Sequence, residues 1–217
     1  MTPRHHLDLA TLVGYSAGAL PPAFAAVAAT HIGLCPQCRA GLSDADRVGG
    51  LLLHQQPPAP VSENARLKLL ARLQSEPDDG VQPQPQSVAA ADLLPAPLRP
   101  YFGDSFSALR WRRVAPGVHH IRGPAMPHGE LMLLRVAAGR SVPQHGHGGS
   151  ELTVILSGAY DDVLGHFAAG DAADLDMDVQ HQPVTSPGPP CICVAAVDAP
   201  LRFSGWFARM LRPLMGF

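Results

Sequence analysis

The chain has 217 residues, enough for one large domain or two small ones at about 100–200 residues per domain. Hydrophobic residues make up 46% of it and charged residues only 16%, which excludes wholesale disorder. The formal net charge of −2 argues against direct, mainly electrostatic binding of nucleic acid. No apolar run approaches the roughly 20 residues that span a bilayer, and no signal peptide is recognisable, so we expect a cytoplasmic protein with no membrane partner.

Apolar positions in the first 80 residues recur at the spacing of amphipathic helices. Leu9, Leu12 and Val13 would share one face of a first helix, and Ser62 is a suitable N-cap for a later one. We expect four short helices, at residues 8–20, 24–30, 44–54 and 62–74. Such short helices bury little apolar surface, so a bundle of this size needs an added stabilising element, such as a bound metal or a partner protein.

Metal-binding residue types cluster at the end of the second expected helix. His31 and Cys35 are four positions apart, on one helix face, and Cys38 follows after two intervening residues. A structural zinc ion needs a fourth ligand, which His5 or His6 could supply if the first helix returns that end of the chain to the site. The spacing does not decide between these two histidines. The alternative is that Cys35 and Cys38 form a redox pair or are unrelated core thiols.

A change in composition near residue 77 separates this bundle from the rest of the chain. Residues 77–100 contain six prolines, which exclude a regular helix, and have little to bury. We therefore predict a zinc-binding helical domain at residues 1–80, a Pro-rich linker at 81–98 and a second domain at 99–217. Few contacts are expected to cross this boundary.

Short strand-like runs separated by glycine and proline turns fill the second part. No helical period of useful length interrupts them before residues 207–215. Many strands without intervening helices favour a sandwich or barrel, so we expect an α+β protein made of a helical domain and an all-β domain. The expected strands are residues 109–114, 130–138, 151–157, 191–197 and 201–206.

A second group of metal-binding residue types lies in the β part. His145 and His147 are two positions apart, so a strand presents both on one face, and Glu151 begins the next strand after a Gly-Gly turn. His181 can add a third imidazole from a later strand. Three histidines and one carboxylate suit Zn²⁺, Mn²⁺, Fe²⁺ or Ni²⁺.

Two further cysteines, Cys191 and Cys193, lie on one face of an apolar strand. They are either small core residues on an inner face or a redox pair near the metal. Both interpretations stay open at this point.

The segment from Gly139 to Gly158 fits the pattern G-x5-H-x-H-x3-E-x6-G and resembles the first motif of the cupin superfamily. The second cupin motif is matched at Gly170-Asp171 and His181, without the usual Pro-x-Gly before the histidine and Asn after it. The resemblance implies a jelly-roll β-barrel with a metal in its mouth. Its implied ligands are His145, His147, Glu151 and His181.

The pairing of these two parts is similar to the ChrR-type anti-sigma factors, a branch of the zinc-binding anti-sigma family. The likeness covers most of the chain, including Arg4-His5-His6, residues 31–39 and residues 191–203. It implies that the helical domain wraps one sigma factor of the extracytoplasmic-function (ECF) class and hides its polymerase-binding surfaces, in a 1:1 complex. It also implies that the cupin domain senses singlet oxygen or a related oxidant, and that the sigma factor is then released. The implied zinc ligands are His6, His31, Cys35 and Cys38.

This resemblance implies a negative regulator of transcription rather than an enzyme. The alternative is a cupin metalloenzyme, such as a dioxygenase, with an accessory zinc domain. Four protein ligands leave few open positions on the cupin metal, and the helical domain offers no substrate chemistry. A DNA-binding activator is disfavoured by the charge of −2 and by the lack of a basic recognition helix.

Overall fold

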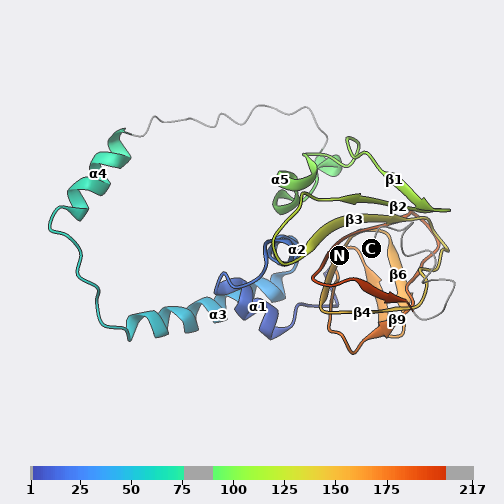
Figure 1. Cartoon of the computed structure of the whole chain (residues 1–217), viewed down its shortest axis with the longest axis horizontal. Helices are drawn as coiled ribbons and strands as arrows, with labels where there is room; N and C mark the ends of the chain where they lie inside the picture. The colour runs from blue at the N-terminus through green and yellow to red at the C-terminus, as the bar shows by residue number, and fades with distance from the viewer. Residues whose placement is uncertain (1, 76–89, 204–217) are drawn as a thin grey trace.

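Helices occupy the N-terminal part of the chain and strands the C-terminal part (Figure 1). The computed structural model describes residues 2–75 and 90–203. The helices are α1 (Leu9–Ser16), α2 (Pro22–Leu34), α3 (Pro36–His54), α4 (Ala65–Ser75) and α5 (Arg99–Phe102), with short 3₁₀ turns at Ala90–Asp92 and Ala96–Leu98. The strands are β1 (Arg112–Ala115), β2 (Val118–Arg122), β3 (Glu130–Val136), β4 (His145–His147), β5 (Glu151–Ser157), β6 (Ala159–Asp162), β7 (Gly165–Ala168), β8 (Ala172–Leu175), β9 (Gln180–His181), β10 (Val184–Thr185), β11 (Cys191–Val197) and β12 (Leu201–Phe203). The predicted α+β class is confirmed.

Proline and glycine set the ends of the first helices. Gly18, with φ of 64°, follows the end of α1, and Pro22 occupies the first turn of α2. Cys35 has an extended backbone that ends α2 and begins α3, and Pro36 follows in the first turn of α3. The helix predicted at residues 44–54 therefore begins at Pro36, because a proline in the first turn lacks only an N–H that the helix does not use.

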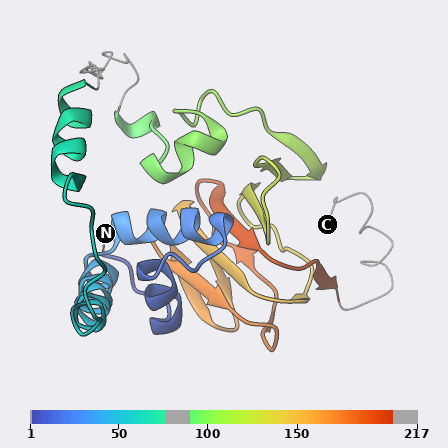
Figure 2. The same cartoon turned by 60° about the vertical axis from the view of Figure 1, so that its left-hand side comes forward.

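The C-terminal half of α3 and all of α4 stand away from the strands (Figures 1 and 2). No residue of α4 is buried. Large apolar side chains on these two helices are 43–73% exposed: Val48, Leu51, Leu52, Leu53, Leu67, Leu69, Leu70 and Leu73. Helices as short as α4 are marginal in water, and apolar faces of this kind are typical of interaction surfaces.

Antiparallel pairing joins the strands into a six-stranded sheet of order β1-β2-β3-β11-β5-β8 and two three-stranded sheets, β10-β6-β7 and β12-β4-β9. Strand β11 lies between β3 and β5, where Val194 pairs with both Leu133 and Val154. Neighbours so distant in sequence are typical of a jelly roll.

Most predicted strands agree closely with those observed. Those predicted at 130–138, 151–157 and 191–197 are confirmed to within two residues, and the one predicted at 109–114 begins at Arg112. The predicted strand at 201–206 is described as far as Phe203, and the predicted helix at 207–215 lies outside the described residues.

The last glycine of the cupin-like motif turns the chain from β5 into β6. Gly158 has a φ of 72°, which side chains rarely adopt. A Cβ at this position would lie 2.6 Å from the carbonyl oxygen of Pro190. Both the conformation and the close approach therefore require glycine.

Helix α2 lies against the six-stranded sheet, and the two parts of the chain share one core (Figure 2). Phe24 and Val27 of α2 pack in the same buried cluster as Leu152, Val154 and other inward residues of the sheet. The expectation that few contacts cross between the two parts is wrong. An almost wholly apolar helix such as α2 must be covered on more than one side, and the sheet supplies part of that cover.

The segment at residues 90–98 was expected to have little to bury, and the structure differs there too. Leu94 and Leu98 are fully buried, and Leu98 belongs to the core cluster shared with α2. Pro97 lies in the first turn of the 3₁₀ helix at Ala96–Leu98, where the lack of an N–H costs nothing. The prolines in this segment therefore shape a packed turn.

Among the helices of the described ranges, none combines the length and the apolar character needed to cross a bilayer.

Candidate metal centres

Four residues from the N-terminal segment and from the junction of α2 with α3 converge on one point. The ligand atoms of His6, His31, Cys35 and Cys38 all lie within 4.8 Å of one another. The His31 Nε2 atom is 3.2 Å from the Cys38 Sγ atom, and the His6 Nδ1 atom is 3.3 Å from the Cys35 Sγ atom and 3.8 Å from that of Cys38. Ligands bound tetrahedrally to one zinc ion are separated by roughly 3.3–3.8 Å. The cluster can therefore hold a four-coordinate metal ion.

The structure separates the two histidines between which the spacing could not decide. His6 is the one that faces the cysteines. The His5 ring instead stacks on Phe167, with ring centroids 3.9 Å apart, and its Nε2 atom is 3.1 Å from the His166 carbonyl oxygen.

His31 is held in the orientation that a metal ligand needs. Its Nδ1 atom lies 2.8 Å from the carbonyl oxygen of Gly170, in the turn between β7 and β8, so Nδ1 carries the proton. The Nε2 lone pair then points toward Cys38. Burial lowers the pKa of His31, which keeps the ring neutral, as metal binding requires.

We expect the zinc affinity of this cluster to rise with pH. Burial raises the pKa of Cys38 to about 11, and a thiol binds metal only as the thiolate, so an incoming ion must displace that proton. Below this pKa, each added pH unit weakens proton competition at Cys38 by about tenfold. The apparent dissociation constant, measured against a competing chelator, should therefore fall by at least about tenfold per pH unit near neutrality. An affinity independent of pH would exclude Cys38 as a ligand.

The second site brings together two of its four predicted residues. His145 of β4 pairs in register with His181 of β9, and their Nε2 atoms are 3.1 Å apart. The Nδ1 atoms face acceptors, the Pro143 carbonyl oxygen at 2.8 Å and an Asp162 carboxylate oxygen at 2.9 Å. Both Nε2 lone pairs therefore point toward a common position, at the separation that two imidazoles take on one metal ion.

The other two predicted ligands lie on the strands β4 and β5. Glu151 begins β5, and its Oε1 atom accepts a hydrogen bond of 2.9 Å from the Thr153 hydroxyl. His147 ends β4, two residues after His145, where its backbone pairs with that of Leu201. Their assignment as ligands stays a prediction.

The buried carboxylate of Asp162 is a site residue that the sequence did not indicate. It holds His181 although β6 and β9 belong to different sheets. No spacing rule connects two such strands, so the pair becomes visible only in the folded chain.

Cys191 and Cys193 are free thiols on β11. Cys191 is buried in a cluster with Tyr160 and Phe167. Burial raises the pKa of Cys191 to about 11 and the pKa of Cys193 well above its usual value. Redox chemistry starts from the thiolate, so this environment favours the core interpretation of the pair.

Together these features define a class: a helical module with a His-Cys cluster that can hold a metal ion, packed on a cupin-type β-barrel. The family described as "ChrR Cupin-like domain" matches residues 104–199. The anti-sigma-E factor ChrR of Cereibacter sphaeroides is 39% identical over 213 residues, which are 98% of this chain and 98% of ChrR. The chain therefore belongs to the family of ChrR-type anti-sigma factors.

Two solved structures are also similar to this chain. A chain in the crystal structure of Rhodobacter sphaeroides SigE in complex with the anti-sigma ChrR matches with a TM-score of 0.77 and 38% identity, over 91% of this chain and 100% of that chain. An RmlC-like cupin protein from Ralstonia eutropha matches 44% of this chain and 67% of its own, with a TM-score of 0.41 and 23% identity.

Proposed function

We propose that this protein is an anti-sigma factor that binds one ECF-class sigma factor in a 1:1 complex and keeps it from RNA polymerase. The observation that carries the proposal is the 39% identity with the anti-sigma-E factor ChrR along 98% of both chains. The aligned residues include those of the helices as well as those of the β fold. RNA polymerase acts in the cytoplasm, so we place this activity there.

The exposed apolar faces of α3 and α4 support this proposal. Amphipathic helices commonly bind partners by laying an apolar face into a groove. In α4, Leu69 and Leu70 lie one turn from Leu73 and present a continuous apolar face, with no residue of the helix buried in this chain. A sigma factor that covered these faces would bury the apolar side chains of α4 that this chain leaves exposed.

We infer that Zn²⁺ binds at His6, His31, Cys35 and Cys38. Two thiolates and two imidazoles form a closed tetrahedral set, which is typical of structural zinc and leaves no position for a substrate. Bound there, the ion would tie the N-terminal segment to the junction of α2 and α3. It would thereby fix the direction in which α3 leaves the core.

We infer that the barrel binds a divalent metal, Zn²⁺ or another, through His145, His147, Glu151 and His181, and that this domain senses singlet oxygen or a related oxidant. The facing Nε2 atoms of His145 and His181 support the metal assignment. A site assembled from several strands makes the packing of the barrel depend on its metal. Oxidation of the metal-loaded site would then release the sigma factor, and a barrel without its metal would give no response.

Substitutions on α4 test the proposal. Leu70→Asp and Leu73→Asp should each weaken binding of the cognate ECF sigma factor by about 30-fold or more, because each places a charge in an apolar contact. Val163→Asp is the matched control, since Val163 is a 78% exposed apolar residue on the barrel. Affinities measured by titration calorimetry would contradict the proposal if both α4 variants bound as tightly as the unaltered chain.

A further inference from the structure

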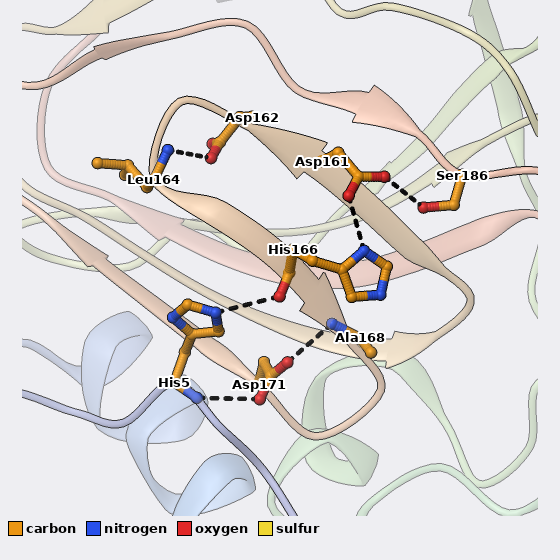
Figure 3. Close-up of polar contacts among 8 residues, drawn as sticks. All are labelled: His5, Asp161, Asp162, Leu164, His166, Ala168, Asp171 and Ser186. Atoms are coloured by element: carbon orange, nitrogen blue, oxygen red, sulfur yellow. Dashed lines mark hydrogen bonds and ion pairs between the residues drawn. The ribbon is translucent and has the colours of Figure 1, made fainter.

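One segment of the barrel reaches both candidate metal centres. It comprises residues 159–175, which form β6, β7, β8 and the turns between them, and we call it the β6–β8 segment. Figure 3 shows several of its polar contacts, from Asp162 and its turn to His5 of the N-terminal segment. The two centres are built from distant parts of the sequence, so any communication between them needs a physical connection.

At the barrel centre, the segment holds His181. The Asp162 carboxylate, at the end of β6, accepts a hydrogen bond from the His181 Nδ1 atom at 2.9 Å and from the Leu164 backbone N–H at 2.8 Å. The side chains of Asp162 and His181 are 0% and 3% exposed, so water does not compete for the bond between them. Such a carboxylate fixes the tautomer and the ring orientation of a metal-binding histidine. The position of His181 is thereby tied to the turn between β6 and β7.

At the His-Cys cluster, the same segment supplies two carbonyl groups. The Gly170 carbonyl accepts from the His31 Nδ1 atom, and the His166 carbonyl lies 3.1 Å from the His5 Nε2 atom. The His5 ring also stacks on Phe167 of β7. His5 precedes His6 in the chain, so β7 and its following turn position two of the four cluster residues, one directly and one through its neighbour.

Asp171 completes this attachment. Its Oδ1 atom accepts from the backbone N–H groups of Arg4 and His5, and its Oδ2 atom accepts from that of Ala168. Asp171 is only 3% exposed. One buried carboxylate therefore joins the N-terminal segment to the end of β7. The His5 carbonyl accepts in return from the Ala172 N–H at 3.3 Å.

We propose that the β6–β8 segment connects the two metal centres mechanically. Asp162 is the positioning residue at the barrel centre, and Gly170 and Asp171 are the positioning residues at the His-Cys cluster. A change at His181 moves the turn held by Asp162, and β7 transmits the shift to the carbonyl and carboxylate groups that hold His31 and the segment bearing His6. The connection rests on the metal assignments of the proposed function, and it acts equally in the reverse direction.

The test measures metal retention in the full-length chain loaded with Co²⁺. Cobalt bound to the cysteines gives a thiolate charge-transfer absorption, and the proposed ligands of the barrel centre contain no sulfur, so the signal reports on the His-Cys cluster. Asp162→Ala, which is remote from that cluster, should speed the loss of this absorption to excess EDTA by about fivefold or more. Asp161→Ala is the matched control, because this neighbouring, exposed carboxylate binds the side chains of His166 and Ser186 and should leave the rate within about twofold.

A double substitution shows whether Asp162 and Asp171 act through one connection or whether each substitution destabilises the fold independently. In Asp162→Ala/Asp171→Ala, the two effects should be less than multiplicative, because each substitution breaks the same connection. If Asp162→Ala lowers the melting temperature markedly, the isosteric Asp162→Asn decides, because its amide has one acceptor oxygen where the carboxylate uses two, one for His181 and one for Leu164. An unchanged Co²⁺ release rate in a folded Asp162 variant, or fully multiplicative effects, would overturn the connection. No sigma factor enters the assay, so this failure is distinct from failure of the anti-sigma proposal.

Discussion

Replacing Cys38 by serine should abolish metal binding at the His-Cys cluster and, with it, binding of the sigma factor. Cys38 is 2% exposed and contacts both His31 and His6, and a serine hydroxyl is a poor zinc ligand at neutral pH. Structural zinc contributes about 10–16 kcal/mol of coupled binding and folding free energy in small domains. The free energy of unfolding of a typical whole domain is about 5–15 kcal/mol, so the zinc contribution is as large as the stability of most domains.

The matched control for this prediction is Cys191→Ser. Cys191 is also a buried thiol, 4% exposed, but it lies on β11 among aromatic side chains, away from the cluster. The control should keep its zinc content at the cluster and its affinity for the sigma factor. Metal analysis of each variant, with the sigma factor titrated in parallel, gives both results. Full zinc content and full affinity in Cys38→Ser would mean that the site is misassigned.

Substituting a ligand of the barrel centre should give the opposite phenotype, normal repression with no response to oxidant. His145→Ala and Glu151→Ala remove proposed metal ligands from β4 and β5, whereas the exposed apolar faces proposed to bind the sigma factor lie on α3 and α4. A sigma-dependent reporter should therefore stay silent in these variants, both without and with singlet oxygen. In the unaltered protein, singlet oxygen should induce it.

His166→Ala serves as the control for the barrel variants. The side chain of this half-exposed histidine on β7 pairs with Asp161 and is not among the proposed ligands of either metal centre, so induction should be normal. Normal induction in His145→Ala and Glu151→Ala, with the barrel metal shown to be absent, would exclude the metal from the switch. The sensing role would then pass to another feature, with Cys191 and Cys193 the next candidates.

The metal-binding residue types were predictable because ligand spacing within one helix or strand is a local property. His31, Cys35 and Cys38 are close in sequence, and the α2–α3 junction brings their backbones together, while the Gly170 carbonyl of the barrel orients the His31 ring. The choice of His6 over His5 was not available from spacing, since it depends on Phe167 and on the carbonyl of His166, far along the chain.

The relation between the two parts of the chain could not be predicted, because it depends on contacts between distant segments. The prolines near residues 95–97 indicated a linker, yet the same prolines begin a short turn that buries Leu98 against α2. The apolar character of α2 was visible in the sequence. The sequence did not indicate that α2 also packs against the six-stranded sheet. Asp162, Gly170 and Asp171 act through such contacts as well, so their roles appear only in the folded molecule.

Transcription in a purified system tests the central claim most directly. RNA polymerase loaded with the cognate ECF sigma factor would transcribe from a promoter specific for that factor, and the zinc-loaded full chain would be added in increasing amounts. We expect transcription to fall to background at one chain per sigma factor, while a promoter served by the primary sigma factor stays active. Undiminished transcription from the ECF promoter in a large excess of folded, zinc-loaded chain would contradict the assignment as an anti-sigma factor.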